Sequence, residues 1–114
     1  MLTMDTLRAF GADVQEGLSR CMGREDFYLR LVKMARGDSN MDKLRDALAA
    51  NDLKAAFEAA HALKGVTANL ALTPIRTPVS EITEHLRAGT QMDYQPLMSE
   101  ITAAWDAFCR LVDC

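Results

Sequence analysis

A histidine and a lysine three residues apart, His61 and Lys64, stand in the middle of a long stretch without proline. Residues three, four and seven apart share one face of a helix, so Gly65 and Ala68 join this pair. An imidazole is largely neutral at pH 7 and can act as a nucleophile. A lysine ammonium beside it suits a phosphoryl group as a compact positive charge. The pattern therefore indicates a nucleophilic histidine on a helix surface, beside a cation that would suit a phosphoryl group.

Gly65 is the second unusual feature of this stretch, because glycine inside a helix costs about 0.5–1 kcal/mol relative to alanine. Together with Ala68 it keeps the surface beside His61 free of bulky side chains. We interpret this surface as room for a partner protein to lie against the helix. Such a partner could bring the catalytic groups needed for a reaction at His61. Helical spacing alone leaves open the alternative that His61 is a surface residue without a role.

The helix expected to carry His61 runs from Asp52 to Leu72. Small or apolar residues recur along it at alternate spacings of three and four, which is typical of a helix packed in a bundle. This inward stripe consists of Leu53, Ala56, Ala60, Leu63, Thr67 and Leu70. His61 lies about 100° around the helix from Ala60. We therefore expect its side chain to be at least partly accessible to solvent.

The rest of the chain shows similar helical spacing and lacks the alternating apolar runs that indicate strands. Further helices are expected over Thr3–Phe10, Asp13–Cys21, Arg24–Arg36, Met41–Ala50 and Tyr94–Val112. Two Thr-Pro pairs precede another helix, which we place from about Thr77 to Arg87, because a proline deep inside a helix removes a hydrogen bond. Short connections favour antiparallel neighbours. The expected fold is therefore all-α: an up-down four-helix bundle with a short extra N-terminal helix.

Apolar residues at helical spacing predict which faces of two other helices are buried. In the helix that follows Gly23, the expected apolar residues are Phe27, Leu31 and Met34, with Leu29 and Val32 beside them. In the last helix, the expected core residues are Leu97, Ile101, Trp105, Phe108 and Val112. We interpret the aromatic residues of this last stripe as core rather than as a ligand site.

Length and composition indicate one soluble domain. The chain has 114 residues, of which 49% are hydrophobic and 25% are charged, and we expect a single helical domain over 1–114 with a bundle core at about 24–113. The net charge of −3 and the lack of a basic cluster disfavour a nucleic-acid partner. The apolar runs are too short to span a bilayer, so we expect no membrane partner. The N-terminus lacks a signal-peptide pattern. We therefore expect a cytoplasmic protein.

The remaining residues of metal-binding type do not form a pattern that suggests a site. Cys21, Cys109 and Cys114 are odd in number and widely spaced, which is typical of reduced thiols rather than of disulfides or zinc ligands. The second histidine, His85, is expected on a helix surface near Glu81 and Glu84 and lacks metal-ligand spacing with His61. The sequence therefore predicts no metal site in this chain.

The residues around His61 resemble the signature of a known family. Ala60-His61-Ala62-Leu63-Lys64-Gly65-Val66, followed by Asn69-Leu70, is similar to the motif of histidine-containing phosphotransfer domains, the HPt family. The resemblance continues through residues 44–52 before the motif and residues 82–89 after it. Two positions depart from it: Ala71 stands where the family often has glycine, and Ala62 where it often has a polar residue. We expect Ala71 to let the helix run slightly further.

The resemblance implies a four-helix bundle that carries phosphate on one exposed histidine. Residue by residue, it makes His61 the phosphoacceptor, Lys64 the positive neighbour of the phosphoryl group and Gly65 the small residue that permits approach. The implied docking surface includes Phe57, Glu58, Gly65 and Ala68. The implied partners are the receiver domain of a response regulator, a hybrid histidine kinase, or both, with phosphate moving between His61 and a receiver aspartate. No cofactor is implied for this chain, and Mg²⁺ is expected on the receiver.

Two further readings of the sequence remain beside that of a phosphate carrier without catalytic activity of its own. A non-phosphorylated docking or adaptor module would bind a receiver or another partner, although docking does not require an exposed histidine next to an ammonium. A histidine kinase is disfavoured, because the chain has no Gly-rich phosphate loop of the P-loop kind and no room for a nucleotide-binding domain. We expect a freestanding protein, since the chain starts with Met1 and ends in a helix, and the alternative is a fragment of a larger hybrid kinase. A monomer is expected because the bundle can close on itself.

Overall fold

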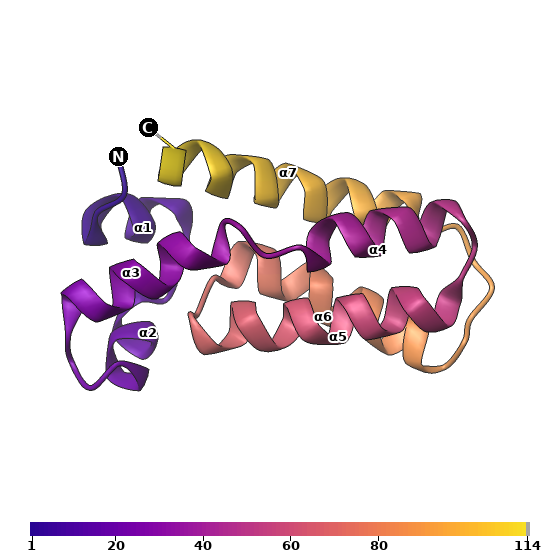
Figure 1. Ribbon diagram of the computed structural model, residues 1–114, viewed down its shortest axis with the longest axis horizontal. Helices are drawn as coiled ribbons and strands as arrows, with labels where there is room; N and C mark the ends of the chain where they lie inside the picture. The colour runs from indigo at the N-terminus through magenta and orange to yellow at the C-terminus, as the bar shows by residue number, and fades with distance from the viewer. Residues whose placement is uncertain (114) are drawn as a thin grey trace.

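In the computed structural model, which describes residues 1–113, the chain forms seven α-helices and no strand (Figure 1). The helices are α1 (Met4–Phe10), α2 (Val14–Arg20), α3 (Glu25–Ala35), α4 (Asn40–Ala49), α5 (Leu53–Asn69), α6 (Thr73–Arg87) and α7 (Gln95–Asp113). The expected all-α class is confirmed. None of the helices within residues 1–113 combines the length and apolar character needed to cross a membrane.

Helices α4 to α7 run alternately up and down along the long axis of the molecule, as expected for an up-down bundle (Figure 1). Helix α5 packs between α4 and α6, and α7 packs against α6. The three N-terminal helices cover one end of the bundle, where the last turns of α7 also lie (Figure 1). The addition before α3 thus consists of two short helices, α1 and α2.

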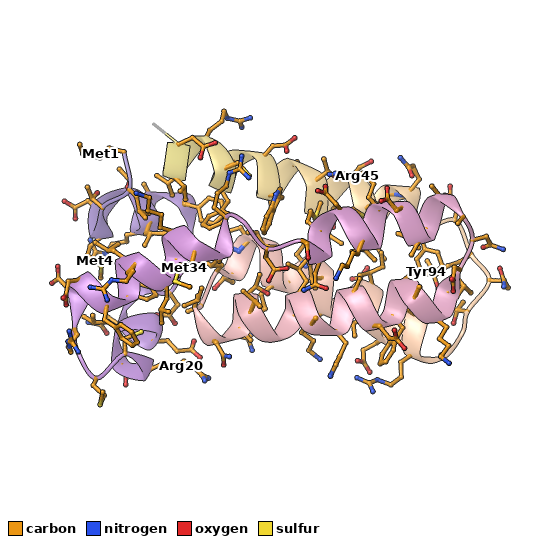
Figure 2. The ribbon with its side chains drawn as sticks, viewed as in Figure 1. Met1, Met4, Arg20, Met34, Arg45 and Tyr94 are labelled. Atoms are coloured by element: carbon orange, nitrogen blue, oxygen red, sulfur yellow. The ribbon has the colours of Figure 1, made fainter. Side chains whose placement is uncertain are left out.

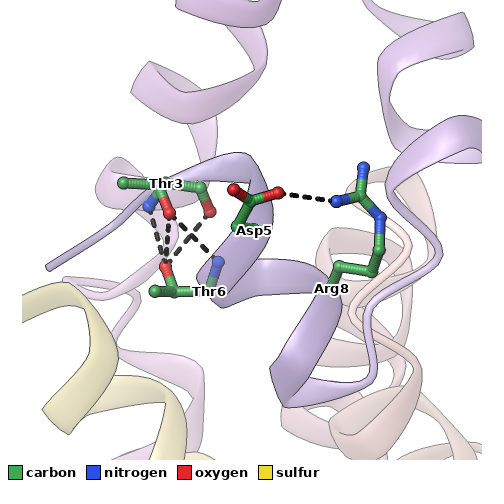
Figure 3. Close-up of polar contacts among 4 residues, drawn as sticks. All are labelled: Thr3, Asp5, Thr6 and Arg8. Atoms are coloured by element: carbon green, nitrogen blue, oxygen red, sulfur yellow. Dashed lines mark hydrogen bonds and ion pairs between the residues drawn. The ribbon is translucent and has the colours of Figure 1, made fainter.

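Local and long-range hydrogen bonds hold the N-terminal helices in place. Helix α1 begins with a capping box, in which the Thr3 and Thr6 hydroxyls accept from each other's backbone N–H at 3.0 and 2.8 Å (Figure 3). Such a box supports a helix too short to be stable alone. Further along, the Tyr28 hydroxyl donates to the Leu70 carbonyl at 2.8 Å. This buried contact ties α3 to the C-terminal end of α5.

The buried face of α3 differs from the expected one. Tyr28, Val32 and Ala35 are buried, whereas Phe27 and Leu31 lie at the border of the core. The Met34 side chain is 67% exposed at the N-terminal end of the molecule (Figure 2). The expected stripe is therefore rotated by about one residue. The physical reason is Tyr28, whose ring fills the core while its hydroxyl finds a partner on α5.

Helix α6 begins at Thr73, so the expected start near Thr77 is wrong. Pro74 occupies the first turn, where a missing N–H costs nothing, and the Leu72 carbonyl accepts from Ile75 and Arg76 at 3.0 and 2.9 Å. Pro78 lies inside the helix and is buried. It removes one backbone donor close to the helix start, and burial of its ring offsets part of that cost.

Helix α5 ends at Asn69, so the expectation that Ala71 extends the helix is wrong. Ala71 adopts a φ of 55°, the left-handed conformation that glycine usually supplies at a helix C-terminus. The Leu72 N–H then donates to the Thr67 carbonyl at 2.9 Å, and the Asp13 N–H donates to the Ala71 carbonyl at 3.0 Å. The turn buries Leu72 completely and joins α2 to the bundle. These contacts offset the cost of the left-handed conformation at an alanine.

The predicted core stripes of the two longest helices are largely confirmed. On α5, Leu53 is only partly buried, and the buried members of the stripe are Ala56, Ala60, Leu63, Thr67 and Leu70. On α7, Val112 is partly buried, and the fully or nearly fully buried members are Leu97, Ile101, Trp105 and Phe108. The burial of one face of α5 leaves its opposite face to solvent.

Candidate functional site

The helix that carries His61 is fixed at both ends and along one side. The Asp52 carboxylate accepts from the Ala55 N–H at 3.1 Å and caps the helix start, which satisfies a donor that has no partner within the helix. Leu63 is completely buried between neighbouring helices. Since His61 lies on the other side of α5, its side chain is exposed, as predicted.

The imidazole of His61 stacks on the ring of a phenylalanine that lies one turn earlier in α5. The Phe57 and His61 ring centroids are 5.6 Å apart, with an interplanar angle of 16°. The guanidinium carbon of Arg87, on α6, lies 5.1 Å from the centroid of the Phe57 ring. Phe57 thus links the histidine to a cation on the neighbouring helix.

Lys64 contacts α6 as well. Its Nζ atom lies 3.8 Å from Oε2 of Glu84, and the same oxygen lies 3.3 Å from Nε of Arg87. The lysine side chain is 36% exposed, so its ammonium remains accessible beside the histidine. The structure therefore gathers His61, Phe57 and Lys64 from α5 with Glu84 and Arg87 from α6. We call these five residues the His61 group.

Glu84 and Arg87 were not predicted from the sequence as site residues. Their signal was present but incomplete: an acidic and a basic residue three apart indicate one helix face, and nothing in the sequence shows which helix that face meets. The contact of α6 with α5 supplies this information. His85, which lies between them in the sequence, is half-buried.

The surface beside His61 is open. A Cβ atom placed on Gly65 would meet no atom within 4 Å, so packing within the chain does not require glycine there. Ala68, one turn further along, is half-buried. Neither residue carries a side chain larger than a methyl group.

Glu58 lies on the other flank of α5 from Lys64. It helps to line a shallow hollow between α4 and α5, together with Lys43 and Asp46. Another hollow, of about 740 Å³, lies between α4 and the start of α7 and contains no histidine. Neither hollow is lined by His61, Phe57 or Lys64.

No alternative centre for metal or thiol chemistry emerges from the described part of the chain. Residues 1–113 contain no group of three or more histidine, cysteine or acidic side chains placed to hold a metal ion. Cys21 is free and buried, and Cys109 is free and partly buried. Burial raises the pKa of the Cys109 thiol, which disfavours the reactive thiolate. Cys114 lies outside the described residues.

Comparison with protein-family models gives one finding that agrees with this geometry. The model described as "Hpt domain" matches residues 33–110. This range contains α4, α5, α6 and most of α7, and thus the entire His61 group. Comparisons with curated proteins and with solved structures give no match.

Proposed function

This chain belongs to the Hpt domain family, and from that premise we propose that His61 is the phosphoacceptor of a phosphorelay. The observation that carries the proposal is the exposed imidazole, held by Phe57 and placed one turn from the Lys64 ammonium. The family is one of phosphate carriers in phosphorelay signalling. The proposal adds the residue that carries the phosphate and its immediate neighbours.

The proposed reaction is transfer of a phosphoryl group between a receiver aspartate and His61. A lone pair on an imidazole nitrogen forms the N–P bond while the P–O bond of the aspartyl phosphate breaks. The bonding pair leaves with the receiver carboxylate, and the imidazole proton stays on the other ring nitrogen until it is released to water. The reverse reaction returns the group to a receiver.

Within this reaction, the residues of the chain orient and stabilise rather than catalyse. Phe57 holds the imidazole by stacking, and Lys64 offers a positive charge to the phosphoryl oxygens. Gly65 and Ala68 leave the surface low, so that a receiver can bring its aspartate and its Mg²⁺ close to the imidazole. Phe57, Glu58, Gly65 and Ala68 are the proposed contact residues for the receiver or a hybrid histidine kinase.

We also propose that the chain works as a monomeric single domain over 1–114, with its bundle core at about 24–113, in the cytoplasm where receivers operate. The exposed His61 face needs no second copy to complete it. Sedimentation at several protein concentrations measures the oligomeric state directly. A dimer whose formation shields His61 from a receiver would contradict this part of the proposal.

The deciding experiment incubates the protein with a panel of phosphorylated receiver domains. Intact mass is measured at neutral pH and after mild acid for the wild type, His61→Gln and His85→Gln. We expect acid-labile phosphate on the wild type and on His85→Gln, and none on His61→Gln. Equal labelling of His61→Gln would overturn the assignment. Binding of a receiver without any labelling would favour the docking-module alternative.

A further inference from the structure

Two cations of the site converge on one oxygen atom, to which the proposed transfer assigns no role. Oε2 of Glu84 lies 3.8 Å from Nζ of Lys64 and 3.3 Å from Nε of Arg87. Arg87 is three residues along the same helix, and its guanidinium also covers the Phe57 ring. The carboxylate thus lies between a lysine of α5 and an arginine of its own helix.

A phosphoryl group on His61 would change the balance of charge around Lys64. At neutral pH it carries between one and two negative charges, and it would sit one helical turn from the lysine. Lys64 then has two anionic partners to choose between, the phosphoryl group and Glu84. Like charges also repel, so Glu84 and the phosphoryl group disfavour each other directly.

We propose that Glu84 is a positioning residue that competes with the phosphoryl group for Lys64. This inference rests on the proposed function of His61. In the unphosphorylated protein, Glu84 holds the Lys64 side chain toward α6. After phosphorylation it weakens the attraction between Lys64 and the phosphoryl group, so that the group is retained less firmly and passes on more readily to a receiver.

The size of the effect follows from the exposure of the groups. The Glu84 side chain is 59% exposed and that of Lys64 is 36% exposed, so water screens their interaction. Exposed ion pairs of this kind change an equilibrium by about two- to fivefold. The effect is also expected to fade at 1 M salt, where the Debye length is about 3 Å.

The test uses phosphoramidate, a small donor that needs no partner protein. Its P–N bond breaks as the imidazole N–P bond forms, and ammonia leaves. All variants carry His85→Gln, so that His61 is the sole histidine of a chain that has 2. The phosphoryl group is titrated by ³¹P NMR in the parent, in Glu84→Gln and in Glu81→Gln. Glu81 is an exposed carboxylate of the same helix.

Removal of the Glu84 charge favours the dianionic phosphoryl group, so its acid dissociation constant rises by about two- to fivefold in Glu84→Gln. We expect a smaller change in Glu81→Gln, and a clearly reduced effect of Glu84→Gln when Lys64→Gln is also present. Identical titrations of Glu84→Gln and Glu81→Gln would overturn the proposal. So would an undiminished effect in the Lys64→Gln background. Failure of every receiver to label His61 would instead count against the proposed function.

Discussion

The Phe57 ring stacks on the imidazole of His61 at a centroid distance of 5.6 Å and an angle of 16° between the planes. The two residues are one turn apart on α5, and Arg87 of α6 contacts the same phenylalanine ring. This relationship gives Phe57 a function within the chain that is separate from any contact with a partner. It restricts the orientations of the side chain that we propose to accept phosphate.

Replacement of Phe57 by leucine tests this restriction. Aromatic pairs contribute about 0.5–1.5 kcal/mol beyond their buried area, so we expect Phe57→Leu to slow phosphorylation of His61 by about two- to tenfold. The rate is measured by intact mass after mixing with a phosphorylated receiver. Phe27→Leu is the matched control, because Phe27 is also half-buried and has an arginine, Arg24, 5.6 Å from its ring centroid. Equal slowing in both variants would contradict the prediction.

Replacement of Lys64 by alanine tests the electrostatic part of the site. Two unit charges 4 Å apart interact by about 1 kcal/mol in water, so Lys64→Ala should reduce the rate of phosphate uptake by about fivefold. Lys54→Ala provides the comparison, because Lys54 is exposed on the same helix nearly three turns away from Lys64. A stopped-flow or quenched transfer assay gives both rates. Indistinguishable rates for the two lysine variants would rule out a specific role for Lys64.

Two substitutions at Gly65 separate helix stability from partner access. Gly65→Ala should increase the free energy of unfolding by about 0.5–1 kcal/mol, because glycine is unfavourable within a helix and a Cβ there meets no other atom within 4 Å. Gly65→Leu should remain folded but transfer phosphate more slowly, because its side chain rises into the surface beside His61. Urea unfolding and the transfer assay measure the two effects. Unimpaired transfer in Gly65→Leu would show that no partner approaches this position.

Replacement of Gly17 by alanine should lower the free energy of unfolding, in contrast to the same replacement at Gly65. A Cβ atom on Gly17 would lie 2.5 Å from atoms of the buried Tyr28 ring, so Gly17→Ala forces α2 and α3 apart. Overpacking of a core typically costs about 1–3 kcal/mol, which exceeds the gain in helix propensity. Urea unfolding should therefore show a loss of stability in Gly17→Ala beside the gain in Gly65→Ala. Stabilisation by both substitutions would mean that the ring moves aside without cost.

The sequence predicted the elements whose signals are local. The spacing on α5 located the buried stripe and the exposed position of His61, because one helix defines both faces. The effect of Pro74 and Pro78, which both lie within α6, was misjudged. The rule against interior proline concerns one hydrogen bond, whereas the burial of Pro78 depends on neighbouring helices. The turn at Ala71 was missed for a similar reason. Its left-handed conformation is imposed by the burial of Leu72.

The candidate site shows the same division between local and long-range information. His61, Phe57 and Lys64 belong to one helix, and their proximity follows from its geometry. Glu84 and Arg87 come from α6, and their position depends on how two helices pack. Tyr28 is a further example, because its partner, the Leu70 carbonyl, is 42 residues away in the chain.

Tyr28 makes the stability of the protein sensitive to alkaline pH. Burial, followed by the nearby charges of Cys21 and Asp13, raises the pKa of Tyr28 from 10.0 to about 12. Between these values the unfolded chain loses the phenolic proton while the folded chain keeps it. The stabilising contribution is therefore complete below pH 10 and is lost as the pH approaches 12. A difference of this size corresponds to about 2–3 kcal/mol.

Tyr28→Phe should remove this pH dependence and also lower stability at neutral pH. The Leu70 carbonyl loses its 2.8 Å donor, and an unsatisfied buried acceptor costs about 1–3 kcal/mol. Urea unfolding at pH 8, 10 and 11.5 should show the wild-type free energy falling toward that of the variant. Tyr94→Phe serves as the control, because it leaves Tyr28 in place and should retain the fall. Parallel curves for the wild type and Tyr28→Phe would mean that another group controls alkaline unfolding.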